Sequence, residues 1–306
     1  FYGFFMTFII RAEGNPVYAT LMMVVATAVN LILDPIFIFL MHMGTGGAAL
    51  ATIISEAVIV LMGLLYIMRK KGLLHIRRKN LNFNWPNIGQ IVYLGLSPAL
   101  MDIAASIQVC ILNARLVGLG GDTAVAAMGI IFSITSLIAL FTFGMGAGMQ
   151  PIIGYNYGAG NYQRVKQTFR YACLSTLFII IFAVILIIIF SRNIAMLFCK
   201  SDPGLIDLSS HGLRIFIFMY PLVGIQILGT RYFQSIGKGV HAVLIGISRQ
   251  LFLFIPILYI LSTAWGVEGV WISSPVTEVL ATIITVFFLV REFKSLNLKI
   301  RLRQLS

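Results

Sequence analysis

Long apolar segments dominate this sequence and leave little room for any other class of fold. A helix that crosses the hydrocarbon core of a bilayer needs about 20 apolar residues, and eight segments exceed that length, separated by glycine, proline or charge. They cover 17–41, 46–69, 87–117, 122–152, 164–190, 206–233, 239–263 and 267–291, and a shorter segment covers 1–11. We therefore predict an all-α polytopic membrane protein with about nine transmembrane helices, of which the first is only the tail of a helix.

The composition agrees with a membrane protein and excludes a soluble domain. Of the 306 residues, 59% are hydrophobic and 10% are charged, whereas a soluble domain has about 25% charged residues. The net charge of +12 would suit nucleic-acid binding in a soluble protein. In a membrane protein the same charge can instead mark cytoplasmic loops.

The positions of the basic residues decide between these two interpretations. Of the 22 lysines and arginines, 17 lie on one set of alternating connectors, while the opposite connectors hold only Arg192 and Lys200. This asymmetry predicts a cytoplasmic C-terminus and no nucleic-acid partner. The 17 are Arg11, Arg69, Lys70, Lys71, Arg77, Arg78, Lys79, Arg164, Lys166, Arg170, Arg231, Lys238, Arg291, Lys294, Lys299, Arg301 and Arg303.

An internal repeat predicts two bundles of helices. The second copy begins near Ile88 and has six helices, so both copies enter the membrane from the same side, as in a parallel repeat. A complete first copy would extend before Phe1, and we expect twelve helices in two six-helix bundles. At a shift of 222 positions Gly44, Gly47 and Glu56 match Gly266, Gly269 and Glu278, and at a shift of 223 Gly14 matches Gly237.

This repeat gives the expected domain boundaries. Residues 1–70 would be the end of the N-terminal bundle, with the tail of helix 4 and helices 5 and 6. Residues 71–87 would be a basic cytoplasmic linker, 88–292 the C-terminal bundle and 293–306 a basic cytoplasmic tail.

Enzyme and metal signatures are absent from the sequence. It has no Gly-x-x-x-x-Gly-Lys-Ser/Thr, His-Glu-x-x-His, Gly-x-Ser-x-Gly or Cys-x-x-Cys motif. The four histidines and three cysteines are widely spaced. We expect no metal site and no cofactor, and we keep a membrane-embedded enzyme and a non-transporting scaffold or receptor as alternatives.

Ionisable residues at membrane depth are the candidate functional groups, because each is costly to insert. Helix geometry places Asp102, Glu56, Glu278 and Arg249 near the midplane. Arg249 and Glu278 lie on consecutive helices and are predicted to form a structural ion pair. The corresponding position in the first copy, near Ala26, has no basic residue, so Glu56 is interpreted either as a proton carrier or as a hydrogen-bonding partner of a neighbouring helix.

Two polar groupings have helical spacing. Asn30 and Asp34 share one helix face, and the following Pro35 removes a backbone donor. This notch would bind a cation or support a kink. Asp102, with Ser106 one turn later, would act in binding or hydrogen-bond across helices.

Several strings resemble the multidrug and toxic compound extrusion (MATE) family, in particular its bacterial branch. The resemblance covers the whole chain in matching order. The strings are Arg11-Ala-Glu-Gly-Asn-Pro16, Asn30-Leu-Ile-Leu-Asp-Pro-Ile-Phe-Ile-Phe39, Gly47-Ala-Ala-Leu-Ala-Thr-Ile-Ile-Ser55, Gln150-Pro-Ile-Ile-Gly-Tyr-Asn-Tyr-Gly-Ala159, Tyr220-Pro221 and Phe233-Gln-Ser-Ile-Gly237.

The resemblance implies a secondary antiporter of the bacterial plasma membrane with twelve helices in two bundles. It would export lipophilic, often cationic, compounds in exchange for protons or sodium, without a cofactor, and we expect a monomer. Asp34 falls on the family's acidic position in the fifth helix, which implies substrate or cation recognition. Ser106 stands where some members have a glutamate, and the acidic residue of the family's first helix would precede Phe1. A lipid-linked saccharide flippase of the same broad superfamily is the alternative transporter.

Overall fold

Every regular element in the described part of the chain is a helix, which confirms the all-α prediction. The computed structural model describes residues 2–68, 84–199 and 202–305. The chain divides into two compact units, Phe1–Asn84 and Trp85–Ser306. Most of the predicted linker, at 69–83, lies outside the described residues.

Unit 1 is a three-helix assembly of α1 (Tyr2–Ala12), α2 (Pro16–Pro35) and α3 (Gly44–Met68), with the π-helical segment η1 (Ile36–Leu40) ending α2. The turn before α2 follows from its sequence, because Gly14 has φ 91° and Pro16 is favoured at a helix start. The side chain of Asn15 caps α2 by accepting a hydrogen bond from the Tyr18 backbone N–H at 3.1 Å. Ile10, Met22 and other apolar side chains fill the core between the helices.

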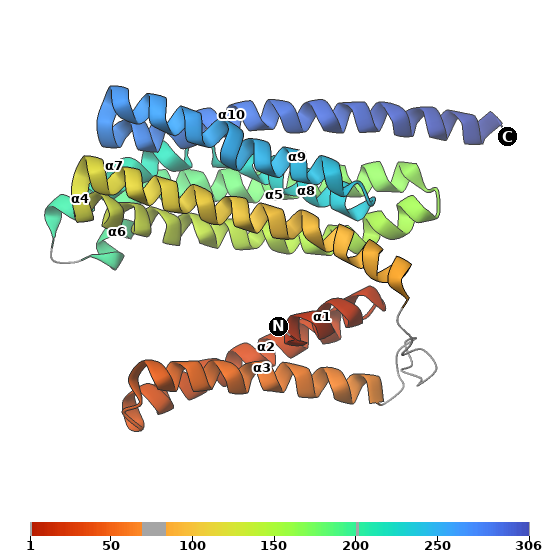
Figure 1. Cartoon of the computed structure of the whole chain (residues 1–306), viewed down its shortest axis with the longest axis horizontal. Helices are drawn as coiled ribbons and strands as arrows, with labels where there is room; N and C mark the ends of the chain where they lie inside the picture. Colours follow the sequence, from red (N-terminus) through yellow and green to blue (C-terminus); the bar gives the residue numbers. More distant parts are fainter. Residues whose placement is uncertain (1, 69–83, 200–201, 306) are drawn as a thin grey trace. The chain divides into compact units, whose positions relative to one another are not determined.

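Unit 2 contains two long helices that fold back on themselves, α4 (Trp85–Gly158) and α10 (Phe254–Leu305). Each is interrupted at a glycine with positive φ, 60° at Gly121 and 58° at Gly266. The other elements are α5 (Tyr162–Ile189), α6 (Ser191–Phe198), α7 (Pro203–Ile217), α8 (Tyr220–Ser235), α9 (Gly239–Ile247) and the π-helical η3 (Ser248–Leu253). Figure 1 shows both hairpins, α4 in yellow to green and α10 in blue.

These hairpins reconcile the helix count with the sequence. Five described helices are long and apolar enough to cross a membrane, or six if the bent pair α7 and α8 is one span. Because α4 and the helix from α9 through α10 each make two passes, the six become eight passes. The 11-residue α1 matches the short apolar segment predicted at 1–11, and the structure agrees with a polytopic membrane protein.

Three predicted boundaries were wrong for local reasons. The predicted helix 206–233 is bent by 52° between α7 and α8, where Pro221 lacks a backbone donor. The connector predicted at 191–205 contains α6, which is held to α7 by a 2.6 Å hydrogen bond from Arg214 Nε to Ser191 Oγ. The last helix does not end at 291 but continues to Leu305.

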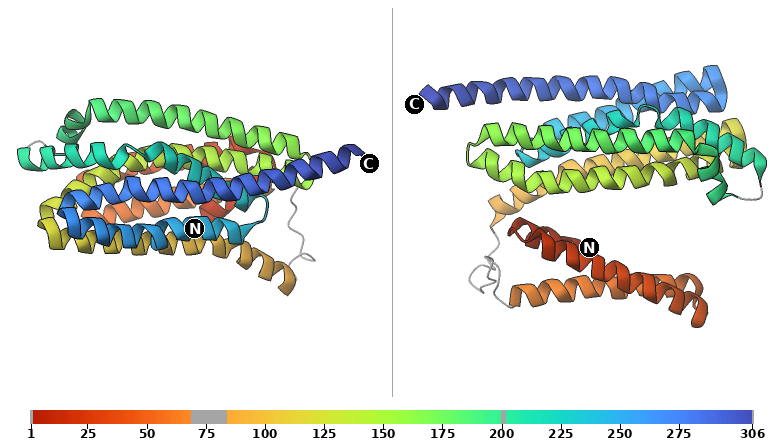
Figure 2. Two further views of the ribbon diagram at one scale, coloured as in Figure 1. Left: turned by 90° about the horizontal axis from the view of Figure 1, so that it is seen from above. Right: turned by 180° about the vertical axis from the view of Figure 1, so that it is seen from behind.

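The extension of α10 takes in the segment expected to be a tail. No glycine or proline follows Pro275, and Phe293, Leu296 and Ile300 keep the spacing of one helix face. Figure 2 shows the end of α10 running beyond the other helices of unit 2.

The core of unit 2 consists of two apolar clusters. One surrounds the buried Trp271 and includes Met128 and Leu213. The other is aromatic, with Phe169 and Tyr232 in edge contact at 5.1 Å between ring centroids. Many large apolar side chains outside these clusters are exposed, such as Phe178 at 74%, as expected for a surface that faces lipid.

The glycine pair found in the repeat closes the two matching helix turns. Gly44 and Gly266 both have positive φ, at 55° and 58°. A Cβ at Gly47 would lie 2.9 Å from the backbone of Phe37, and one at Gly269 would lie 2.0 Å from the carbonyl oxygen of Leu261. Each of the two turns therefore needs one glycine that adopts positive φ and a second that allows close packing of the backbone.

We predict that Gly269→Ala lowers the free energy of unfolding by at least about 1–3 kcal/mol, because the added methyl group overlaps backbone that cannot rotate away. Thermal unfolding of the purified protein in detergent measures the effect. Gly118→Ala is the matched control, since nothing lies within 4 Å of its added Cβ, and alanine there should be neutral or stabilising by up to about 1 kcal/mol. Equal stability of both variants would contradict the packing argument.

Candidate functional site

Each unit contains a polar cavity formed by its own helices. The cavity of unit 1 measures about 190 Å³ and lies between α1, α2 and α3. The cavity of unit 2 measures about 230 Å³ and lies between α4, α8, α9 and η3. Both are enclosed by otherwise apolar helices, so their polar side chains are the candidates for binding.

Asn30 and Glu56 meet in the cavity of unit 1, where Asn30 comes from α2 and Glu56 from α3. Glu56 stands twelve residues from either end of α3, which places the carboxylate at the middle of the helix. The helix α1 packs closely behind it, since a Cβ at Gly3 would lie 2.7 Å from Glu56 Oε2.

The hydroxyl groups of this cavity bond to backbone and leave the amide and carboxylate as its distinctive groups. Thr7 Oγ1 donates to the Phe4 carbonyl at 2.7 Å, and Ser55 Oγ donates to the Thr52 carbonyl at 2.8 Å. A neutral amide beside a carboxylate offers oxygen ligands to a cation and hydrogen bonds to a protonated acid.

Asp34 lies one helical turn beyond Asn30 on α2 and does not line this cavity. Its Oδ1 atom is buried and accepts no hydrogen bond from the residues that the structure describes. Directly after it, Pro35 ends α2 and η1 begins. The predicted notch is therefore a change from α- to π-helix, which widens the backbone and often marks a functional position.

Asp102 lies in the other unit, in the cavity of unit 2, together with Arg231 and Gln226 from α8. Ser106 Oγ donates to the Asp102 backbone carbonyl at 2.9 Å. The guanidinium of Arg231 also lies 5.7 Å from the centroid of the Phe143 ring, a cation–π contact. The described cavity thus combines an acid, a base and an aromatic wall.

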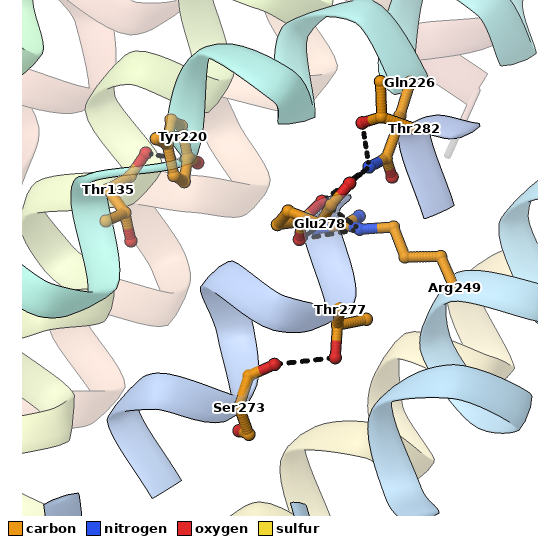
Figure 3. Close-up of polar contacts among 8 residues, drawn as sticks. All are labelled: Thr135, Tyr220, Gln226, Arg249, Ser273, Thr277, Glu278 and Thr282. Atoms are coloured by element: carbon orange, nitrogen blue, oxygen red, sulfur yellow. Dashed lines mark hydrogen bonds and ion pairs between the residues drawn. The ribbon is translucent and has the colours of Figure 1, made fainter. Parts of the chain in front are cut away.

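Arg249 and Glu278 form a bidentate ion pair beside this cavity (Figure 3). Arg249 Nη2 lies 2.7 Å from Glu278 Oε1, and Arg249 Nε donates to both carboxylate oxygens at 3.0 and 3.2 Å. The Glu278 side chain is only 6% exposed. Two parallel donors to one buried carboxylate make a strong, directional contact.

Gln226 adds a third helix to this contact, as Figure 3 shows. Its Nε2 donates to Glu278 Oε2 at 2.7 Å, to the Glu278 carbonyl at 3.0 Å and to Thr282 Oγ1 at 3.0 Å. The pair therefore joins α8, η3 and α10. Sequence reasoning missed Gln226, although it is a polar residue within a predicted transmembrane helix, and it assigned Arg231 to the cytoplasmic connectors, whereas Arg231 lies within α8 at the cavity.

The two cavities occupy corresponding positions of the internal repeat. At the shift of 223, five residues of the first cavity fall on five residues that line the second. Beside them, Gly3 corresponds to Gln226 at the same shift, and Glu56 corresponds to Glu278 at a shift of 222. The five pairs are Phe4 with Ile227, Thr7 with Thr230, Met23 with Gly246, Ala26 with Arg249, and Thr27 with Gln250.

Among residues 2–68, 84–199 and 202–305, no group of three or more histidine, cysteine or acidic side chains is placed to hold a metal ion. The three cysteines, Cys110, Cys173 and Cys199, are unbonded to one another. The arrangement of the cavities suits binding and exchange of small cations or protons.

Comparison with known proteins gives the family. The family model described as MatE matches residues 99–260, more than half of the chain. The chain belongs to the MATE family. The matched family and its named relatives are transporters rather than enzymes, in agreement with the sequence.

Two multidrug export proteins called MepA illustrate the relationship. This MATE chain is 29% identical over 277 residues to MepA of Staphylococcus haemolyticus strain JCSC1435, covering 90% of this chain and 60% of that protein. It is 28% identical over 273 residues to MepA of Staphylococcus aureus strain N315, covering 89% and 60%. The chain therefore spans about 60% of the length of these curated relatives.

Solved MATE structures have the same fold. A crystal structure of MATE in complex with MaL6 superimposes with a TM-score of 0.91 at 26% identity, over 97% of this chain and 67% of that one. An outward-facing multidrug resistance MATE transporter of the MOP superfamily gives 0.89 at 27% identity, over 95% and 66%.

We predict that Arg249→Met and Glu278→Gln each destabilise the protein by about 3–5 kcal/mol, because each leaves a buried polar or charged group without its partner. The double variant should lose less than the sum of the two, since the partners contact each other. Unfolding in a denaturing detergent titration measures all three. Arg192→Gln is the control, because the Arg192–Asp207 pair is 63% and 64% exposed and should contribute at most about 1 kcal/mol. Additive losses would refute the direct coupling.

Proposed function

We propose that this MATE chain is part of a secondary multidrug exporter that removes lipophilic, often cationic, compounds from a bacterium by alternating access. In this proposal twelve helices form two six-helix bundles in the plasma membrane, with the C-terminus in the cytoplasm. The observation that carries the proposal is the polar cavity of unit 1, where Asn30 and Glu56 lie at mid-helix within apolar helices. Ionisable groups at such depth usually serve transport.

The coupling step that we propose is an exchange of cation and proton at the acidic residues of unit 1. A ligand shifts a conformational equilibrium only by its differential affinity for the two states. Protonation of Glu56 or Asp34 removes the charge that attracts an organic cation, so proton and substrate would favour opposite states. Sodium could replace the proton through the same oxygen ligands.

The second cavity would contribute to substrate recognition. Asp102 supplies a negative charge that would attract cations, and Phe143, whose ring contacts the Arg231 guanidinium, supplies an aromatic wall for the lipophilic part of a substrate. Gln234 lines the same cavity and would adapt to different polar groups. We infer that breadth of substrates depends on this region and that ion coupling depends on unit 1.

The flippase alternative needs a basic cavity that binds a lipid pyrophosphate. Three of the arginines within predicted helices bind other protein groups. Arg115 Nε donates to Ser262 Oγ at 2.8 Å, Arg214 Nε donates to Ser191 Oγ at 2.6 Å, and Arg249 pairs with Glu278. The contacts of these arginines favour multidrug export over the flippase.

We predict that Asp34→Asn in the intact protein weakens export of organic cations at least tenfold more than export of neutral compounds, because a lost charge contact costs about 1.4 kcal/mol or more. Transport by proteoliposomes of matched protein content measures both. Asp122→Asn, which removes an exposed carboxylate, is the control. Equal losses for cationic and neutral compounds would exclude charge recognition by Asp34.

We predict that Glu56→Gln abolishes the acceleration of efflux by an imposed pH gradient, because glutamine cannot bind or release a proton. The assay compares proteoliposomes with a pH gradient, a sodium gradient or neither. Glu268→Gln serves as control, since Glu268 pairs with His211 on an exposed surface. Persistent pH-driven efflux in Glu56→Gln would show that another residue couples efflux to protons. Efflux by the wild type that responds only to the sodium gradient would identify sodium as the coupling ion.

A further inference from the structure

A groove of about 740 Å³ lies between α5 and α10 of unit 2, away from both cavities described above. Its residues on α5 follow one helix face at spacings of three and four. The groove residues on α10 have the same spacing and form the opposite wall. The residues used below are Lys166, Arg170 and Leu174 on α5, and Phe293, Asn297 and Ile300 on α10.

The groove changes from polar to apolar along α5. Lys166 and Arg170 lie about 6 and 12 Å from the helix start at Tyr162, at 1.5 Å per residue. Leu174 follows about 18 Å along, and the buried Phe169 forms part of the floor. Cationic heads above an apolar floor match the division of a phospholipid into headgroup and acyl chain.

One polar contact spans the groove and fixes its positive charge. Lys166 Nζ donates to Asn297 Oδ1 at 2.7 Å, which holds the ammonium group between the two helices. An ammonium group has three donors, so two stay available to a phosphate. The exposed Arg170 presents a guanidinium one turn deeper, and its fork binds phosphate oxygens in pairs.

No acidic residue lines the groove within the described part of the chain. Glu292, next to Phe293 in the sequence, is buried and forms an ion pair with Lys238. The positive charge of Lys166 and Arg170 is therefore not compensated by a carboxylate in the groove. A lipophilic cation would be repelled there, which separates this groove from the export pathway.

We propose that this groove is a binding site for one anionic phospholipid, with its phosphate between Lys166 and Arg170 and its acyl chains along Phe169, Leu174 and Phe293. Basic pockets between helices on the cytoplasmic side bind anionic headgroups, and we assign these ends of α5 and α10 to that side. The positive end of the α5 dipole adds to the attraction. The bound lipid would join the C-terminal half of α10 to α5.

Native mass spectrometry of the purified intact protein tests this site, with phosphatidylglycerol, phosphatidylcholine or glycerol phosphate added in turn. The wild type should retain one phosphatidylglycerol at concentrations where phosphatidylcholine is lost. Lys166→Gln with Arg170→Gln should weaken this binding roughly 30-fold, from about 1 kcal/mol for each basic residue. Lys166→Arg with Arg170→Lys keeps both charges and should retain it.

The control removes the same amount of charge from α5 and α10, the two helices that form the groove, at positions outside it. Arg164→Gln with Lys294→Gln changes two exposed residues that do not line it and should alter lipid binding less than threefold. Equal weakening in both double variants would show a diffuse basic surface and overturn the site. Equal retention of phosphatidylcholine, or displacement by equimolar glycerol phosphate, would also overturn it. Thermal unfolding in neutral detergent verifies that each variant is folded, and export assays in neutral lipid test the transport proposal independently.

Discussion

The lack of water within the hydrocarbon core is the constraint on which the rest of this structure depends. Backbone N–H and C=O groups must bond within their own helices there, so the chain reverses direction only at turns. At these turns, glycines such as Gly44, Gly121 and Gly266 adopt positive φ, which other residues reach only with strain. The same constraint favours a partner or a cavity for polar side chains at depth, as for Glu278 beside Arg249 and Asn30 in the cavity of unit 1.

Much of the fold was predictable because this constraint appears directly in the sequence. The order of the long helices, the turns at Gly44 and Gly266 and the position of Glu278 opposite Arg249 follow from apolar length, glycine placement and the repeat. The bend near Pro221 and the extension of α10 to Leu305 were missed. The bend and the extension depend on packing between helices and on the helix propensity of the local residues. Neither can be read from the length of an apolar segment.

The cavities were less predictable than the helices because they arise from contacts distant in sequence. Glu56 was identified from its depth and Asn30 from its helical spacing to Asp34, but their meeting in one cavity requires the packing of α2 against α3. Gln226 resembles many polar residues near helix ends, and its role emerges only from three hydrogen bonds to the helix that carries Glu278. Depth in the membrane therefore identifies candidate functional residues, whereas contacts between helices show which of them lie together.

The repeat shows how two similar cavities came to differ in what they can do. In unit 2, Arg249 neutralises Glu278, and separating a buried pair of this kind costs about 3–5 kcal/mol. Free energies that couple two ligands through a conformational change are typically about 1–3 kcal/mol. This difference favours a structural role for the Arg249–Glu278 pair. In unit 1, Ala26 stands at the position of Arg249, so no guanidinium from α2 competes with a cation beside Glu56. Arginine at one of these matching positions and alanine at the other thus distinguish the polar lining of the two cavities.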